Sequence, residues 1–241
     1  LRQLALYARY GVTTVFSLGG DGPEGVTLRD EQDDASLDRA RLFVAGPVVA
    51  ADTPEEARQQ VRAVAELGAD LVKIRVDDFL GRAQKMPPEV YEAVIDKAHS
   101  LGLRVAVHLY YLEDAKAVLR AGADFIAQSV RDAEIDDELV ELLVENEVCL
   151  CPTLTREVSA FVYETTPEFF DDPFFLREAD PADLQQLSNP ERQARVHDSP
   201  NTEIYKQALV TAQRNLRRLS EAGVAIAFGT GRPDSSINRT A

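Results

Sequence analysis

The chain has 241 residues, 45% of them hydrophobic and 28% charged, and its formal net charge is −15 at pH 7. This composition is typical of a soluble globular protein, and the negative charge excludes nucleic acid and anionic membrane surfaces as principal partners. No apolar stretch approaches the roughly 18 residues that a membrane-spanning helix needs.

Cys149 and Cys151 are the only cysteines of the chain. Residues two apart on a strand point the same way, but a disulfide between them would be strained. We therefore expect two unpaired thiols in a reducing compartment, which favours a cytoplasmic location.

A short pattern recurs along the chain, in which a helix end is followed by a glycine and an apolar strand. The pattern occurs in RYGVTTVFSL, ELGADLVKIRV, SLGLRVAVHLY, RAGADFIAQSV and EAGVAIAFGT, and also in VENEVCLCPTL, where Asn146 replaces the glycine. Glycine suits the left-handed residue that ends a helix, and asparagine is the next-best residue there. With RLFVAGPVV added, the predicted strands span residues 12–18, 42–49, 70–76, 103–108, 124–128, 148–152 and 224–229.

Helices are predicted between these strands. Thr53 can cap a helix that starts at Pro54, with Glu56 completing a capping box, and Pro88 opens the next helix. Alternating strands and helices favour parallel strands with right-handed crossovers. We predict a (β/α)8 TIM-type barrel that lacks its first strand, forming one domain over residues 1–241. An open doubly wound sheet is the alternative, but no glycine-rich dinucleotide fingerprint follows any strand.

Residues 154–201, after the seventh strand of the barrel, interrupt the alternation of strands and helices. The segment contains five prolines and six phenylalanine or tyrosine residues. Loops of this length are usually functional, so we predict a helical, lid-like insertion over the barrel mouth. A surface excursion that packs its aromatic side chains on the outer helices is the alternative. The strand edges left open in such a barrel also predict self-association, so a homo-oligomer is expected.

The segment GADLVKIRVDDF, residues 68–79, places a lysine in the middle of an apolar strand. Val72, Ile74 and Val76 form one face of this strand, and Lys73 projects from the other. Burying an ammonium group is costly unless something compensates for its desolvation. A lone lysine in a strand is more often ion-paired or solvated at its tip than catalytic.

Polar side chains are predicted at the carboxyl ends of several strands, where the chemistry of such barrels gathers. Alternation along the strand that carries Val105 and Val107 leaves His108 pointing inward. Lysine and histidine at equivalent points of adjacent strands favour a functional site. The residues expected at this mouth are Ser17, Lys73, His108, Gln128 and Cys151.

Five segments together resemble the metal-dependent amidohydrolase superfamily, most of all its imidazolonepropionase-like and prolidase-like hydrolases. They are YGVTTVFSLGG, LFVAGPVV, GADLVKIRVDD, LRVAVHLYYLEDAKAVLRAGADFIAQSV and GVAIAFGTGRPD, and they cover essentially the whole chain in order. The resemblance implies a barrel with one or two divalent metals, usually zinc. Its ligands would be an HxH pair on the first strand, a carboxylated lysine, two later histidines and an aspartate. The implied reaction is hydrolysis of a carbon–nitrogen bond in a small amide, dipeptide or cyclic amide.

Carried over by position, Lys73 matches the carboxylated lysine and His108 matches the first later histidine, so both are predicted catalytic residues and metal ligands. Carboxylation turns the ammonium into an anion that can bridge two cations, and neutral imidazole is a good zinc ligand. Gln128 stands where the second later histidine is expected, and its amide oxygen is a weaker ligand. Tyr110 and Tyr111 are predicted to contact substrate, with core or rim packing as the alternative.

Other positions depart from the family pattern. Gly231 stands where the resemblance implies the aspartate that accepts the proton of the attacking water, and Asp234 lies three residues further on. The HxH strand is expected to precede Leu1, and neither His99 nor His197 replaces it. Hydrolysis by this chain as written is therefore expected to be absent or very slow.

Two alternatives to a hydrolase stay open. One is a degenerate, non-catalytic binding protein with the same fold. The other is a Schiff-base lyase or aldolase that uses Lys73 as its nucleophile. Stoichiometric metal would support the hydrolase, and borohydride trapping with a carbonyl substrate would support the lyase.

Overall fold

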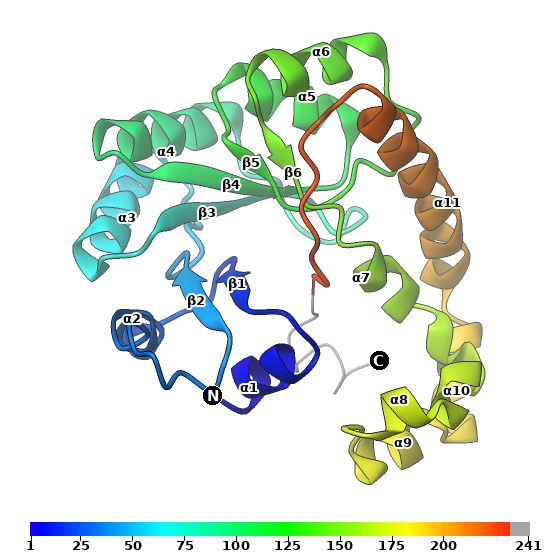
Figure 1. Ribbon diagram of the computed structural model, residues 1–241. Coiled ribbons are helices and arrows are strands. Elements are labelled where there is room, and N and C mark those ends of the chain that lie inside the picture. The colour runs from blue at the N-terminus through cyan, green and yellow to red at the C-terminus, as the bar shows by residue number, and fades with distance from the viewer. Residues whose placement is uncertain (232–241) are drawn as a thin grey trace.

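The computed structural model describes residues 1–231, whose strands form two parallel sheets (Figure 1). The smaller sheet pairs β1 (Thr14–Ser17) with β2 (Arg41–Val44). The larger sheet contains β3 (Leu71–Val76), β4 (Arg104–Leu109), β5 (Phe125–Ile126) and β6 (Cys149–Leu150), in that order. The predicted parallel α/β fold is confirmed.

Two isolated bridges continue the same strand order. Val49 pairs with Ile74 of β3, and Ile226 pairs with Leu150 of β6, both in parallel. Within residues 1–231 no pairing joins β1 to the chain at Ile226, so the sheets are not closed. Closure into a barrel stays a prediction.

Several strands are shorter than predicted. The expected strand over residues 42–49 stops at Val44 because Gly46 has a φ of 66° and the next residue, Pro47, has no N–H to donate. The expected strand over residues 224–229 forms only the bridge at Ile226.

Helices α3 (Pro54–Leu67), α4 (Pro88–Ser100), α5 (Leu112–Arg120) and α6 (Asp137–Glu145) follow the pattern predicted between strands. The N-terminus of α3 is capped by Thr53, whose hydroxyl oxygen accepts a hydrogen bond from the Glu56 N–H at 3.3 Å. The Glu56 carboxylate does not close the predicted capping box on Thr53. It accepts instead from the N–H of Asp52, at 3.1 Å.

The glycine rule for helix ends is confirmed, because Gly11, Gly68, Gly102, Gly122 and Gly223 all have positive φ. The prediction that Asn146 takes the same left-handed conformation is wrong. Asn146 has a φ of −88°, and the left-handed residue is its neighbour Glu147, at 51°. Helix α6 extends one residue further than this pattern predicts, so the left-handed conformation falls on Glu147. The side chain of glutamate tolerates this conformation less well than that of asparagine.

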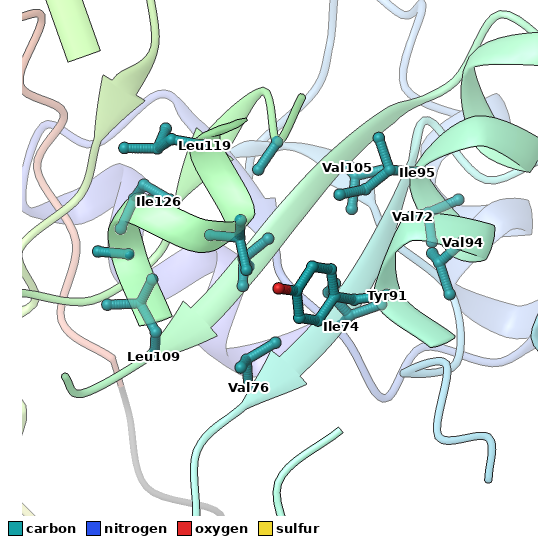
Figure 2. Close-up of a cluster of buried hydrophobic side chains, with 14 of the residues drawn as sticks. Val72, Ile74, Val76, Tyr91, Val94, Ile95, Val105, Leu109, Leu119 and Ile126 are labelled. Atoms are coloured by element: carbon teal, nitrogen blue, oxygen red, sulfur yellow. The ribbon is translucent and has the colours of Figure 1, made fainter. Parts of the chain in front are cut away.

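The main hydrophobic core lies between the larger sheet and helices α3 to α6. Figure 2 shows Val72, Ile74 and Val76 of β3 packed with side chains of α4 such as Val94 and Ile95. The opposite face of β3, which carries Lys73, therefore points away from this core. A second, smaller core joins β2 to α1 (Arg2–Arg9) and includes Leu4, Ala40, Leu42 and Val44, with Val26 and Leu28 of α2 (Pro23–Asp30) packed against it.

The segment after β6 is helical, as predicted. It contains α7 (Leu154–Ser159), the 3-10 turns η1 (Val162–Glu164) and η2 (Glu168–Asp171), and the helices α8 (Pro173–Leu176), α9 (Pro181–Leu187), α10 (Pro190–His197) and α11 (Pro200–Glu221). Its aromatic rings pack largely on one another, with Phe169, Phe170 and Phe175 in mutual contact. The segment also reaches α1, where the rings of Phe174 and Tyr10 meet at 4.9 Å.

No helix in residues 1–231 combines the length and the apolar character that a membrane crossing requires. Cys149 and Cys151 are free thiols, as predicted.

Candidate active site

A cavity of about 2180 Å³ lies along the inner face of the strands. Its wall includes all five residues predicted at the strand ends, namely Ser17, Lys73, His108, Gln128 and Cys151. The wall also includes Tyr163 of η1 and Tyr205 of α11, so the helical segment borders the same cavity.

Lys73 is buried in this wall with 6% of its surface exposed, and among residues 1–231 it forms no ion pair with a carboxylate. The nearest acidic residues along the chain are engaged elsewhere, Asp70 with Arg29, Asp77 with His108 and Asp78 with the hydroxyl of Tyr111. Burial, aided by the positive charge of Arg75, lowers the pKa of Lys73 to about 7. A large fraction of this amine is therefore neutral near pH 7.

The loop after β1 closes over the stem of Lys73. Gly19 has a φ of 117°, and a Cβ placed there would lie 3.4 Å from Cγ of Lys73 and 2.5 Å from a methyl carbon of Val48. Only glycine lets the backbone approach this closely without moving its neighbours. Gly19 thus completes the desolvation of the lysine.

His108 is held by a buried carboxylate. Its Nε2 lies 2.8 Å from Oδ2 of Asp77, while Oδ1 of Asp77 accepts the N–H of Phe79 at 2.9 Å. Burial lowers the pKa of His108 to about 4, against the raising effect of Asp77. Burial would raise the pKa of Asp77, but the hydrogen bonds from His108 and Phe79 outweigh it and lower that pKa.

A neutral imidazole beside an ionised carboxylate has one consistent arrangement. The proton is on Nε2 and is donated to Asp77, which leaves the lone pair on Nδ1 of His108. Within residues 1–231, Nδ1 has no hydrogen-bond partner. His108 can therefore accept a proton or bind a cation through Nδ1.

Buried oxygen atoms without a partner within residues 1–231 mark the same cavity. They are Oε1 of Gln128, Oγ1 of Thr153 and Oδ2 of Asp21. Such atoms lose the hydrogen bonds that they would make in water, so they favour a ligand that supplies a donor or a cation. The sequence reasoning missed Asp21 and Thr153. Asp21 could have been found from its place after the glycine pair that follows β1.

Gly231 lies against the loop after β6. A Cβ at Gly231 would approach the Cβ of Thr153 to 2.7 Å, and the φ of Gly231 is 55°. The aspartate implied by the family pattern therefore does not fit at this position without a shift of Thr153. Asp234 lies outside the described residues.

The two tyrosines predicted to contact substrate are engaged with other side chains. Tyr110 is buried under the guanidinium of Arg131, 4.4 Å from its ring. Tyr111 donates a hydrogen bond to Asp78 at 2.8 Å, and its ring lies 3.8 Å from Nζ of Lys85. Neither tyrosine lines the cavity, and substrate contact by them stays a prediction.

One aromatic side chain that lines the cavity close to His108 is Phe79, which the sequence reasoning missed. Its ring centroid lies 6.3 Å from that of His108, and Cζ of Arg75 lies 5.2 Å from the same ring. His99 on α4 pairs with Asp124 and does not itself line the cavity.

No family model matches the chain. Over 123 residues it is 28% identical to uncharacterized proteins of Mycobacterium tuberculosis and Mycobacterium bovis, a match that covers 49% of this chain and 32% of theirs.

Solved structures cover far more of the chain. A putative prolidase from Bifidobacterium longum is 26% identical with a TM-score of 0.67, and the match covers 95% of this chain and 53% of that one. A Xaa-Pro dipeptidase with bound methionine is 24% identical with a TM-score of 0.64, at 95% and 59% coverage. A prolidase complexed with N-methylphosphonate-L-proline is 18% identical with a TM-score of 0.67, at 95% and 57% coverage.

The chain therefore has the fold of the amidohydrolase superfamily, a superfamily of enzymes. Among the solved structures that it resembles are prolidases, and it spans 53–59% of the length of the three described above.

Proposed function

We propose that this chain forms part of a metal-dependent hydrolase that acts on carbon–nitrogen bonds in a small amide, dipeptide or cyclic amide. The observation that carries the proposal is the buried, unpaired amine of Lys73 beside the neutral imidazole of His108. The prolidases of similar fold, with bound methionine or a phosphonate analogue of proline, support a small-molecule substrate.

The donor atoms at the cavity decide whether a divalent metal ion fits there. Residues 1–231 contain no group of three or more His, Cys, Asp or Glu side chains that could hold a metal ion. Three other features fit one: the unpartnered Oε1 of Gln128, the free Nδ1 of His108 and the uncharged fraction of Lys73. Once Lys73 is carboxylated, these three side chains would hold a divalent ion, with zinc as the expected metal. When bound, such an ion polarises the substrate carbonyl and lowers the pKa of water.

Carboxylation of Lys73 needs no group beyond the lysine and dissolved CO₂. The neutral amine attacks the carbon of CO₂, a nitrogen–carbon bond forms as one carbon–oxygen π bond opens onto its oxygen, and one proton passes from the nitrogen to water. The product is a carbamate anion in place of an ammonium cation. The lowered pKa of Lys73 favours this reaction because only the neutral amine is nucleophilic.

Two further residues orient the site. Asp77 fixes the ring of His108, and Gly19 excludes water from the stem of Lys73. No side chain at Gly231 accepts a proton from the attacking water, so we expect hydrolysis by this chain alone to be absent or very slow. A Schiff-base lyase remains the second candidate because it would use the same neutral amine of Lys73.

The test compares the parent chain with Lys73→Ala, Lys73→Arg and Lys116→Ala, because Lys116 is also buried but is ion-paired to Asp136. Incubation with ¹³C-bicarbonate should give a carbamate carbon signal in the parent and in Lys116→Ala but in neither Lys73 variant. Zinc occupancy after dialysis should follow the carbamate signal. Equal zinc occupancy in all four proteins would refute the assignment of Lys73 as a carboxylated metal ligand. Borohydride trapping of Lys73 with a carbonyl compound would support the Schiff-base lyase instead.

A further inference from the structure

We propose that the buried Glu157–Arg131 ion pair is a positioning device, through which the first helix of the helical segment fixes the chain that carries His108 and Gln128. Neither residue of the pair lines the cavity, so each acts through the residues that it holds. Both were absent from the candidates that the sequence suggested.

Arg131 joins the ends of two neighbouring strands. Its Nη1 donates to the carbonyl oxygen of Leu109 at 3.1 Å and to that of Ser129 at 2.6 Å. Leu109 directly follows His108, and Ser129 directly follows Gln128. One guanidinium thus fixes the backbone next to both proposed ligands, on β4 and after β5.

The position of Arg131 depends in turn on α7. Oε1 of Glu157 lies 3.0 Å from Nε of Arg131, and each side chain is 1% exposed. The contact is an ion pair rather than an aligned hydrogen bond. The ring of Tyr110 lies 4.4 Å from Cζ of Arg131 and covers one side of the guanidinium. A charge this deeply buried needs its partner, because removing one member leaves the other uncompensated.

Glu157 also connects outward to the cavity wall. Nη1 of Arg156 lies 3.2 Å from Oε1 of Glu157, and Cζ of Arg156 lies 5.0 Å from the ring of Tyr205 on α11. Arg156 and Tyr205 both line the cavity. A displacement of Arg156 or Tyr205 would therefore alter the position of Glu157. Through Arg131 it would also alter the backbone beside His108 and Gln128.

Ion pairing elsewhere in the chain provides a matched control. Lys116 on α5 is nearly as buried, at 5% exposure, and pairs with Glu113, Asp136 and Glu138, but it does not line the cavity. Replacing Lys116 with Met removes a shielded cation, whose carboxylate partners are 46–78% exposed, without touching the ends of β4 and β5. If the Glu157–Arg131 pair contributed stability alone, its loss and the loss of the Lys116 pairs would have the same spectroscopic consequences.

The chain has three histidines, so ¹⁵N-histidine labelling of the 241-residue chain gives a simple spectrum in which His108 reports on the cavity wall and His99 on a position that does not line it. Glu157→Gln should shift the ring signals of His108 and leave those of His99 in place. Arg131→Lys should do the same, because a single ammonium nitrogen keeps the charge but cannot contact the two carbonyl oxygens from one position and Glu157 from another, as Nη1 and Nε of Arg131 do. Lys116→Met should lower the Tm without moving His108.

The proposal is overturned if Glu157→Gln and Arg131→Lys fold and leave His108 unshifted, or if Lys116→Met shifts His108 equally. Should Glu157→Gln fail to fold, the Arg131→Lys spectrum decides alone. Because the readout involves no substrate and no metal, it is independent of whether the chain hydrolyses anything.

Discussion

Lowering the pH should weaken the fold through His108 in a defined window. The pKa of His108 is lowered from its ordinary value of 6.5 to about 4. Between these values the unfolded chain binds a proton at this residue and the folded chain does not, so stability falls as the pH falls. At about 1.4 kcal/mol per pKa unit, the full window corresponds to about 3 kcal/mol. Asp77, whose pKa is also lowered, loses its contribution only at more acidic pH.

The assay is urea unfolding at about pH 7 and about pH 4, applied to the parent chain and to His108→Gln. The stability of the parent relative to His108→Gln should decrease by about 3 kcal/mol between the two pH values. His99→Gln controls for the loss of an imidazole outside the cavity. Parallel losses of stability in the parent and in His108→Gln would refute the reasoning, because the proton uptake would then occur elsewhere.

Two further predictions concern the edges of the site and of the sheets. Gly231→Asp should destabilise the chain by about 2–4 kcal/mol, from the left-handed backbone and the contact with Thr153, and adding Thr153→Gly should recover part of the lost Tm. Retention of the parent Tm by Gly231→Asp would show that this backbone accepts the implied aspartate. The chain should also self-associate, because Phe16 on β1 is 53% exposed and Phe228 beyond the Ile226 bridge is 85% exposed at the two open sheet edges. Sedimentation velocity should detect association that Phe16→Lys weakens, and a concentration-independent monomer would contradict this expectation.

The inward position of Lys73 follows from sequence because it depends only on strand alternation. Val72, Ile74 and Val76 fill the core, so the side chain between them has to face the other way. Strand ends are less predictable because single residues decide them. Gly46 and Pro47 stop β2 early, and the left-handed turn after α6 falls on Glu147 instead of Asn146.

The partners of the site residues depend on contacts between segments far apart in the chain, and no local pattern encodes these. Asp77 lies only four residues after Lys73 in the chain, but it pairs with His108 on the next strand. Tyr110 is only two residues after His108, yet its ring packs against Arg131 and does not line the cavity. Glu157 acquires its role only when α7 packs beside the chain that follows β5.

The position of Arg75 favours the carbamate over the Schiff base as the use of Lys73. Arg75 lies two residues from Lys73 on the same inner face of β3, and its positive charge helps to lower the pKa of the amine. The two products differ in charge. A carbamate is an anion, which the adjacent guanidinium stabilises, whereas a protonated Schiff base restores the positive charge that Arg75 disfavours. The same residue that keeps the amine of Lys73 neutral before reaction thus stabilises one product and destabilises the other.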